Sequence, residues 1–412
     1  MSRAERMKTT ICLYLDYLVH GMAIVILAQN MTVLGRQWHV GDAGVSMVIS
    51  SLGIGRLLVL YIAGSLSDRF GRRLFVKIGI VTYVCFFVGI VGSRNVYTAY
   101  FFGILAGMAN SFLDTGTYPA LMELYPNKQA AANILIKAFA SIGELILPIF
   151  VATLENFNLW YGWSFIFCAV AMLVNFVFLW HREFPPMNTV PAPEVESTMT
   201  VAEDKTATKK PRITAHQWIL GTVLTVFGYI SMATFYLISQ WLTQYGYSVV
   251  GLNMVHARLL VSVYSVGSIL GVIFTVSLVE RVIKPVWFML VDTIISFVTL
   301  LVMAMFPNLA LMMIGSFIIG CSAASGVMQI GLTIMGTVFP RAKGKITGIY
   351  NTAGAIASFS IPVFTAIISK TSIHNIMWFD VLIALVGIIC SVTVMTMLKH
   401  QPKTTSQTEQ MV

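Results

Sequence analysis

The ten residues Gly64–Arg73, GSLSDRFGRR, place one acid and three arginines between two long apolar runs. The flanking runs cover residues 43–66 and 74–93, and each reaches the length of about 20 residues that a helix needs to cross ~30 Å of hydrocarbon. Arginine is retained on the cytoplasmic side of a membrane, so a short basic segment between two such runs is typical of a cytoplasmic loop. The stretch therefore predicts two transmembrane helices joined on the cytoplasmic side.

Apolar runs of this kind recur along all 412 residues of the chain. Hydrophobic residues make up 57% of the sequence and charged residues only 10%, whereas soluble domains carry about 25% charged residues. We therefore predict an all-α membrane protein with twelve transmembrane helices in two pseudo-symmetric six-helix halves. The predicted spans are residues 9–34, 43–66, 74–93, 96–124, 131–154, 160–181, 215–243, 257–279, 284–305, 309–337, 345–369 and 374–398.

The formal net charge of +9 reflects membrane topology and does not indicate a nucleic-acid partner. If both termini are cytoplasmic, most Lys and Arg residues fall in cytoplasmic segments, as the positive-inside rule requires. The exceptions are Arg36, Arg94, Arg258 and Lys370 outside the membrane, and Arg56 and Lys137 within helices. We expect a multi-pass protein of the plasma or inner cell membrane, with both termini cytoplasmic, that is embedded in the lipid bilayer as a monomer.

The segment between the sixth and seventh runs differs sharply in composition from the rest. It is rich in Pro, Thr and charged residues, and such a segment cannot bury enough apolar surface to fold alone. Pro126 and Pro148 of the first half correspond in register to Pro340 and Pro362 of the second, as expected for parallel repeats. The expected domains are the first half, 1–181; a cytoplasmic linker, 182–214; the second half, 215–399; and a cytoplasmic tail, 400–412.

Motifs for covalent chemistry and for metal binding are absent from the sequence. The five cysteines lie inside apolar runs without paired spacing, so we predict neither a disulfide nor a metal framework. No H-E-x-x-H, G-x-S-x-G or P-loop motif occurs, which argues against an enzyme. We expect no cofactor, with a proton as the coupling ion.

The loop Gly64–Arg73 resembles the loop between the second and third helices of the major facilitator superfamily, where a glycine, an acid and basic residues form a conformational latch. The resemblance covers essentially the whole chain, because twelve spans, a central linker and similar halves accompany it. It implies a secondary transporter whose halves rock about a central site. The implied latch residues are Gly64, Asp68, Arg69, Arg72 and Arg73. The alternative is a plain positive-inside loop.

A second resemblance concerns LDTGTYPAL, residues 113–121, and NILIKAFASIGE, residues 133–144. Both are similar to the fourth and fifth helices of fucose–proton symporter-like permeases. The resemblance implies that Asp114 stands at the proton-binding carboxylate and Lys137 at a glutamine that binds sugar hydroxyls. This sequence departs from the pattern in that Tyr118 replaces an asparagine, and Asp16 and His20 occur earlier in helix 1 than the family's acid. Sugars are therefore not the only substrate class that the sequence allows.

Depth along the predicted helices places several polar residues at one level. At ~1.5 Å per residue, four ionisable residues on four helices lie about 16–18 Å from the cytoplasmic face, where such transporters bind substrate. These four are His20, Arg56, Asp114 and Lys137. The predicted proton-coupling residues are Asp114, His20 and Asp16. The predicted substrate-binding residues are Lys137, Arg56, Gln329, Asn351, Tyr118 and Tyr350.

The function that these residues favour is proton-coupled symport of a small polar metabolite, such as a sugar, a sugar acid or another small carboxylate. Two cations and a carboxylate at one depth suit a substrate that carries an acidic group and hydroxyls. The alternative is a drug–proton antiporter, which shares the loop but carries a glycine-rich end to helix 5 that is absent from GELILPIFVA, residues 143–152. A transporter-like nutrient sensor is a third class, disfavoured by the short linker and tail.

Other interpretations of single residues stay open at the level of sequence. Asp114 and Lys137 could form a buried ion pair that only aligns two helices, Arg56 could be a structural counter-ion, and His20 could be a core residue. Glu123 and Glu144 are interpreted as residues at the rim of the membrane. Asp292, on the ninth helix, has no interpretation from the sequence alone.

Overall fold

The computed structural model describes residues 2–125, 129–184, 215–279, 283–324, 326–339 and 343–399. These ranges contain only helices as regular structure, and twelve candidate membrane spans among them confirm the predicted fold class. The helices are α1 (Arg3–Gln29), α2 (Met31–Gln37), α3 (Asp42–Phe70), α4 (Arg72–Gly92), α5 (Val96–Leu124), α6 (Gln129–Asn156), α7 (Gly162–Trp180), α8 (Ala215–Ser248), α9 (Met254–Val279), α10 (Pro285–Met305), α11 (Leu309–Ala323), α12 (Val327–Val338), α13 (Lys343–Ser369) and α14 (His374–Lys399). Most of the expected linker and the whole expected tail lie outside the described residues.

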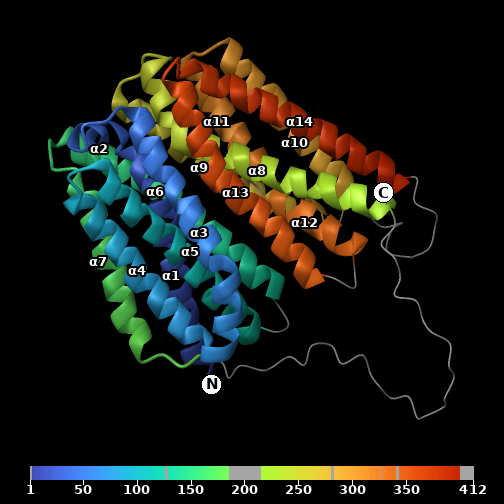
Figure 1. Ribbon diagram of the computed structural model, residues 1–412, viewed down its shortest axis with the longest axis horizontal. Coiled ribbons are helices and arrows are strands. Elements are labelled where there is room, and N and C mark those ends of the chain that lie inside the picture. The colour runs from blue at the N-terminus through green and yellow to red at the C-terminus, as the bar shows by residue number, and fades with distance from the viewer. Residues whose placement is uncertain are drawn as a thin grey trace.

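The helices form two bundles, α1–α7 and α8–α14, that meet at one end and diverge toward the end where both termini lie (Figure 1). Helices are the elements expected here, because backbone groups in hydrocarbon must find hydrogen-bond partners within their own segment. Small residues set the helix packing within each bundle. A Cβ atom on Gly55 would lie 1.9 Å from the carbonyl oxygen of Ile104, and one on Gly267 would lie 2.2 Å from that of Phe317. Glycine therefore permits the α3–α5 crossing and the corresponding α9–α11 crossing.

Two predicted spans are interrupted. The run 9–34 divides into α1 and α2 at Asn30, whose amide nitrogen donates to the carbonyl oxygen of Ile26 at 2.9 Å. The run 309–337 divides into α11 and α12, and Gly326 between them has a φ of +112°, in the left-handed region that favours glycine. Interrupted helices in membrane proteins occur where the freed backbone lies inside protein or beside a cavity.

Polar contacts join the two bundles near the end opposite the termini. Gln240 on α8 donates to the carbonyl oxygen of Ile24 at 2.8 Å, and Gln244 donates to Asp42 at 2.7 Å. Arg258 on α9 pairs with Glu155 at the end of α6. In this conformation, therefore, the bundles are held together at the end opposite to the termini.

Candidate functional site

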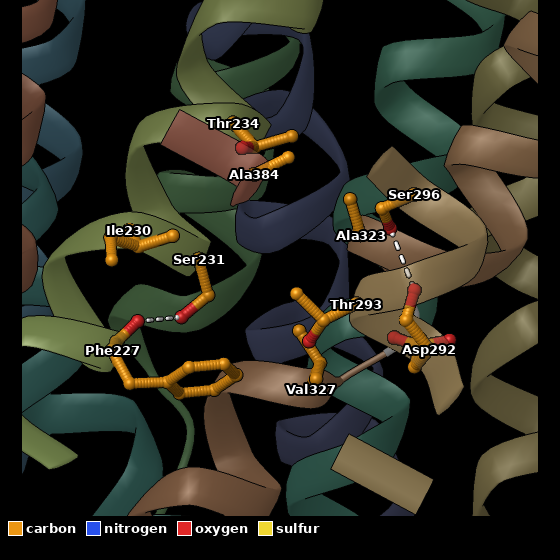
Figure 2. A pocket seen from close by; sticks show the side chains of 10 residues that line it. All are labelled: Phe227, Ile230, Ser231, Thr234, Asp292, Thr293, Ser296, Ala323, Val327 and Ala384. Carbon is orange, nitrogen blue, oxygen red and sulfur yellow. Dashed lines mark hydrogen bonds between the residues drawn. The ribbon is translucent and has the colours of Figure 1, made fainter. Parts of the chain in front are cut away.

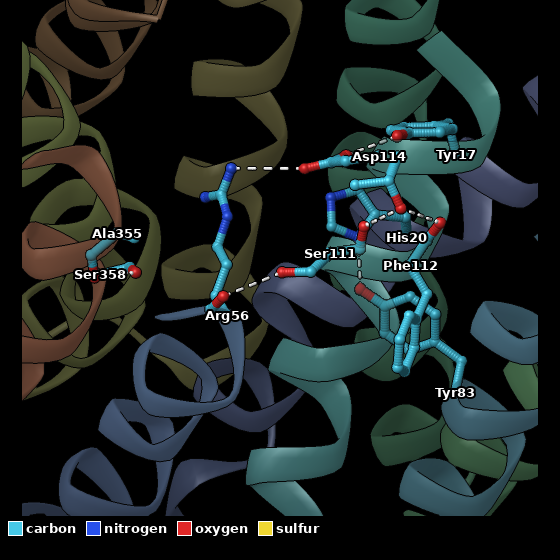
Figure 3. Close-up of polar contacts among 10 residues, drawn as sticks. Tyr17, His20, Arg56, Tyr83, Ser111, Phe112, Asp114, Ala355 and Ser358 are labelled. Carbon is cyan, nitrogen blue, oxygen red and sulfur yellow. Dashed lines mark hydrogen bonds and ion pairs between the residues drawn. The ribbon is translucent and has the colours of Figure 1, made fainter. Parts of the chain in front are cut away.

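Asp114 on α5 lies at the centre of a polar cluster in the first bundle (Figure 3). Its Oδ1 accepts a hydrogen bond from the hydroxyl of Tyr17 on α1 at 2.6 Å, and its Oδ2 lies 3.5 Å from a guanidinium nitrogen of Arg56 on α3. Asn110, one turn earlier on α5, donates to Oδ2 at 3.2 Å when its amide nitrogen faces the carboxylate. The carboxylate thus has partners from three helices.

The cluster owes its geometry to close helix packing. The backbone carbonyl of Arg56 accepts a hydrogen bond from Ser111 on α5 at 3.1 Å, which ties α3 to α5 directly beside the ion pair. Gly107 makes this approach possible, because a Cβ atom there would lie 1.9 Å from the carbonyl oxygen of Leu52. The Arg56 and Asp114 side chains keep 18% and 19% exposure, so the pair is partly buried but not sealed.

His20 lies next to this ion pair in the same bundle. Its Nδ1 is 2.6 Å from the hydroxyl of Tyr83 on α4, and its ring contacts Tyr17 edge to face at 5.4 Å between centroids. Tyr118 also contacts Tyr17 edge to face, at 5.9 Å. The structure therefore brings together four of the predicted residues, His20, Arg56, Asp114 and Tyr118.

Lys137 and Asp16 have different surroundings. The partner of Asp114 is Arg56, whereas the Nζ of Lys137 on α6 lies 4.4 Å from the ring centroid of Phe235, a residue of the second bundle. Asp16 is fully buried on the α7 side of α1, where it accepts a hydrogen bond from Asn175 at 2.7 Å. Asp16 is thus separated from the Asp114 cluster, and Lys137 lies between the bundles.

The second bundle contributes other residues than the sequence suggested. Tyr236 on α8 lies near Arg56, and Ser358 on α13 lies across from Arg56 in Figure 3. Tyr350 is fully buried against α8 and donates to the carbonyl oxygen of Met328 at 2.9 Å. Asn351 is half-buried on α13, and Gln329 is exposed at the start of α12. Tyr350 therefore packs inside its own bundle.

The basic loop after α3 contacts several neighbouring helices. Arg72 lies 3.5 Å from Glu123 at the end of α5 and donates to Ser67 at 3.1 Å, while Arg73 donates to the carbonyl oxygen of Trp180 on α7. Gly71 adopts a φ of +98°, which glycine tolerates without strain. Arg69 is exposed. The side chain of Asp68 and the surroundings of Gly64 lie outside the described residues.

Two further acidic residues, Glu144 and Asp292, are buried. Glu144, interpreted from the sequence as a residue at the rim of the membrane, is fully buried within the protein. Asp292 borders a small cavity in the second bundle, together with residues of α8, α10, α11, α12 and α14 (Figure 2). The cavity measures about 30 Å³, room for a water molecule or two and far less than a metabolite needs.

Sequence reasoning missed Tyr17, Tyr83 and Asn110, which all contact the cluster. Asn110 lies four residues before Asp114, on the same helix face, and this spacing was an available signal. Tyrosines are common in membrane helices, so nothing in the sequence distinguished Tyr17 and Tyr83. Among the described residues no three His, Cys, Asp or Glu side chains gather as a metal site would require.

Comparisons with known proteins agree with this architecture. The family model of the Major Facilitator Superfamily matches residues 10–257 and 250–411. The chain is 48% identical over 379 residues to the inner membrane transport protein YdiM of Escherichia coli (strain K12), covering 92% of this chain and 91% of that protein.

Two solved structures share the fold at low sequence identity. A D-xylose–proton symporter superposes with a TM-score of 0.74 at 15% identity, covering 94% of this chain and 97% of the symporter. A bacterial homolog of the human lysosomal transporter Spinster, in an inward-facing and unoccupied conformation, superposes with a TM-score of 0.72 at 13% identity, covering 96% and 99% of the two chains.

The family match extends over both bundles, and it accords with the twelve spans. It also confirms the prediction that the protein is a membrane transporter and not an enzyme. The chain belongs to the Major Facilitator Superfamily.

Proposed function

We propose that this transporter takes up a small polar metabolite with an acidic group and hydroxyls, such as a sugar acid, by symport with a proton. The observation that carries the proposal is the ion pair between Asp114 and Arg56, which lies inside the membrane yet remains partly exposed. An ionisable pair at this depth is costly, so it is expected to have a function. A proton and a substrate can each compete for one member of the pair.

The charges of the cluster favour an acidic substrate. Arg56 and Lys137 supply two positive charges, and Asp114 supplies one negative charge when it is ionised. Protonation of Asp114 leaves Arg56 without its counter-ion, and a substrate carboxylate can take that place, with Lys137 as a second cation nearby. A guanidinium can bind a carboxylate through two parallel hydrogen bonds. Substrate affinity would then depend on the protonation of Asp114, which coupling requires.

Hydroxyl and amide groups around the ion pair support recognition of a polar substrate. Tyr17 and Asn110 donate hydrogen bonds to Asp114, and Tyr118 lies beside Tyr17. Tyr236 faces them from the second bundle near Arg56. His20, next to Tyr17, is the second titratable group at this level and our candidate for sharing the proton with Asp114.

Loop charge supports an orientation with both termini in the cytoplasm. In that orientation, the end where the bundles are joined faces outward, and the end where they diverge faces the cytoplasm. We assign the conformation as inward-facing, the state that releases an imported substrate together with its proton.

Replacement of Asp114 by Asn tests the assignment in proteoliposomes loaded with candidate substrates. Asp114→Asn is expected to abolish accumulation driven by a proton gradient, because the amide cannot exchange a proton, and to retain counterflow exchange. The matched control is Asp16→Asn, which removes a buried carboxylate of the same bundle that is bonded to α7. This control should keep driven accumulation.

Two results would contradict the proposal. Driven accumulation that survives in Asp114→Asn would show that coupling occurs elsewhere, and its loss in Asp16→Asn alone would place coupling at Asp16.

Substrates are first identified by thermal-shift screening of purified protein against sugar acids, small carboxylates, neutral sugars and cationic drugs. Stabilisation by cationic drugs alone would favour the antiporter alternative.

A further inference from the structure

Glu144 on α6 is a buried carboxyl group for which the transport mechanism above has no use. Its side chain is fully inaccessible, and neither carboxyl oxygen has a hydrogen-bond partner among the described residues. Buried polar groups in proteins are nearly always hydrogen-bonded, so a carboxyl group with two unpartnered oxygens requires an explanation.

The group lies at the contact between the two bundles. The next residue, Leu145, accepts a hydrogen bond from Ser262 on α9 at 3.0 Å, and Ser141, one turn earlier, lies 3.2 Å from Ser268 on α9. Tyr264, also on α9, lies near Glu144, and its buried hydroxyl likewise has no hydrogen-bond partner among the described residues. Glu144 is therefore buried by α9, a helix that must move relative to α6 when the bundles separate.

Glu144 forms no ion pair with any residue that the structure describes. Lys137, two turns earlier on α6, interacts with Glu144 electrostatically, but its Nζ lies against Phe235. Tyr264 of α9 lies near Glu144. Asp380 of α14 lies near Tyr264 in turn, but its carboxylate accepts a hydrogen bond from Thr234. Titratable side chains on the other helices packed against α6 have their own contacts. Those in the membrane interior include Tyr14, Asp16, Tyr17 and His20 on α1, Asp114 and Tyr118 on α5, and Cys168 on α7.

An ionised carboxylate in such surroundings is strongly disfavoured, whereas the neutral acid is tolerated. We propose that Glu144 is a second proton-binding site, protonated while the α6–α9 contact is closed and ionised when that contact opens to water. Closing the outward end then requires a proton from the outward solution. This role is separate from substrate coupling at Asp114, since it uses only the opening and closing of the two bundles.

The test measures how often the α6–α9 contact opens at different pH values. The reporter variant is Ser262→Cys, at a position buried in this contact, and its new thiol reports opening by reacting with a water-soluble maleimide in purified protein without substrate. The same protein with Ser262 retained corrects for the five native cysteines. Maleimides react with the thiolate, so at each pH the labelling rate is divided by that of the same thiol in the denatured protein. As the pH rises through the range in which Glu144 ionises, this normalised labelling rate should rise about tenfold per pH unit, as linkage to one proton requires.

Glu144→Gln replaces the ionisable group with a neutral amide of similar size. In this variant the rise of the normalised labelling rate with pH should disappear, and the contact should stay as closed as in the parent at low pH. Glu155→Gln is the matched control, because it removes an acid from the same helix and the same end. It should raise labelling equally at all pH values, since its ion pair with Arg258 is lost, and leave the slope unchanged.

Three outcomes would overturn the proposal: a normalised labelling rate that does not change with pH in the parent reporter, an unchanged slope of that rate in Glu144→Gln, or a slope lost in Glu155→Gln as well. The first of these needs no variant at Glu144, so the test stands even if Glu144→Gln does not fold. Asp114→Asn in the same reporter should keep the slope. A failure of Asp114 as the coupling residue is therefore distinguishable from a failure of Glu144 as the second proton site.

Discussion

At the scale of single residues, Lys137 is a positive charge positioned between the bundles without a carboxylate in ion-pair contact within the described part of the chain. Lys137→Gln should shift substrate preference from acidic toward neutral compounds by about tenfold, the effect of ~1.4 kcal/mol in binding. The measurement is competition by matched acids and neutral analogues in counterflow exchange. Lys370→Gln, a loss of the same charge at an exposed position, is the control.

An unchanged substrate profile in Lys137→Gln would reject a role of this charge in binding.

The residue types of the cluster could be predicted from the sequence, because ionisable groups inside apolar runs are conspicuous. Their pairing could not. Rise per residue predicts depth but not the direction in which a side chain points, so the alternative of an Asp114–Lys137 pair stayed open until the structure paired Asp114 with Arg56.

At the scale of helices, the α3–α5 crossing determines where Arg56 meets Asp114. Gly107→Ala would place a Cβ atom 1.9 Å from the carbonyl oxygen of Leu52 and 2.7 Å from the amide nitrogen of Arg56, so the helices must move apart. We expect a loss of about 1–3 kcal/mol in stability, as for other overpacked contacts, and weaker substrate binding. Thermal denaturation and ligand-induced stabilisation of the purified protein measure the two effects.

Gly92→Ala is the control for this change, because a Cβ atom there would meet no atom within 4 Å. Equal stability and substrate affinity of the two variants would mean that close packing at this crossing determines neither property.

The helices themselves were predictable from apolar run length. The interruptions at Asn30 and Gly326 were not, since both lie within continuous apolar runs and depend on contacts with other helices.

At the scale of the whole molecule, Arg258 joins the bundles at the end opposite the termini. It is buried, pairs with Glu155 and donates to the carbonyl oxygen of Gln29 at 3.3 Å. Arg258→Gln should weaken this closed end by about 1.5–3 kcal/mol, which corresponds to a roughly tenfold to hundredfold larger open population. Distances between spin labels on the two bundles at that end measure the shift.

Arg94→Gln removes an exposed arginine of the loop between α4 and α5 and should leave the distance distribution unchanged. A distribution that responds equally to both substitutions, or to neither, would contradict a specific role of Arg258 in closure. The conformational balance belongs to this scale because it depends on the sum of contacts between two bundles far apart in sequence.

The sequence by itself determined that the chain crosses a membrane with twelve helices, that its superfamily is the major facilitator superfamily, and that acids and bases share one depth. Hydropathy and charge act locally along the chain, so these properties can be read without knowing which helices touch. The tertiary structure decided that Asp114 pairs with Arg56, that Asp16 bonds to α7, and that Glu144 is sealed between α6 and α9. These depend on helix rotation and on contacts between the bundles, which no local pattern encodes.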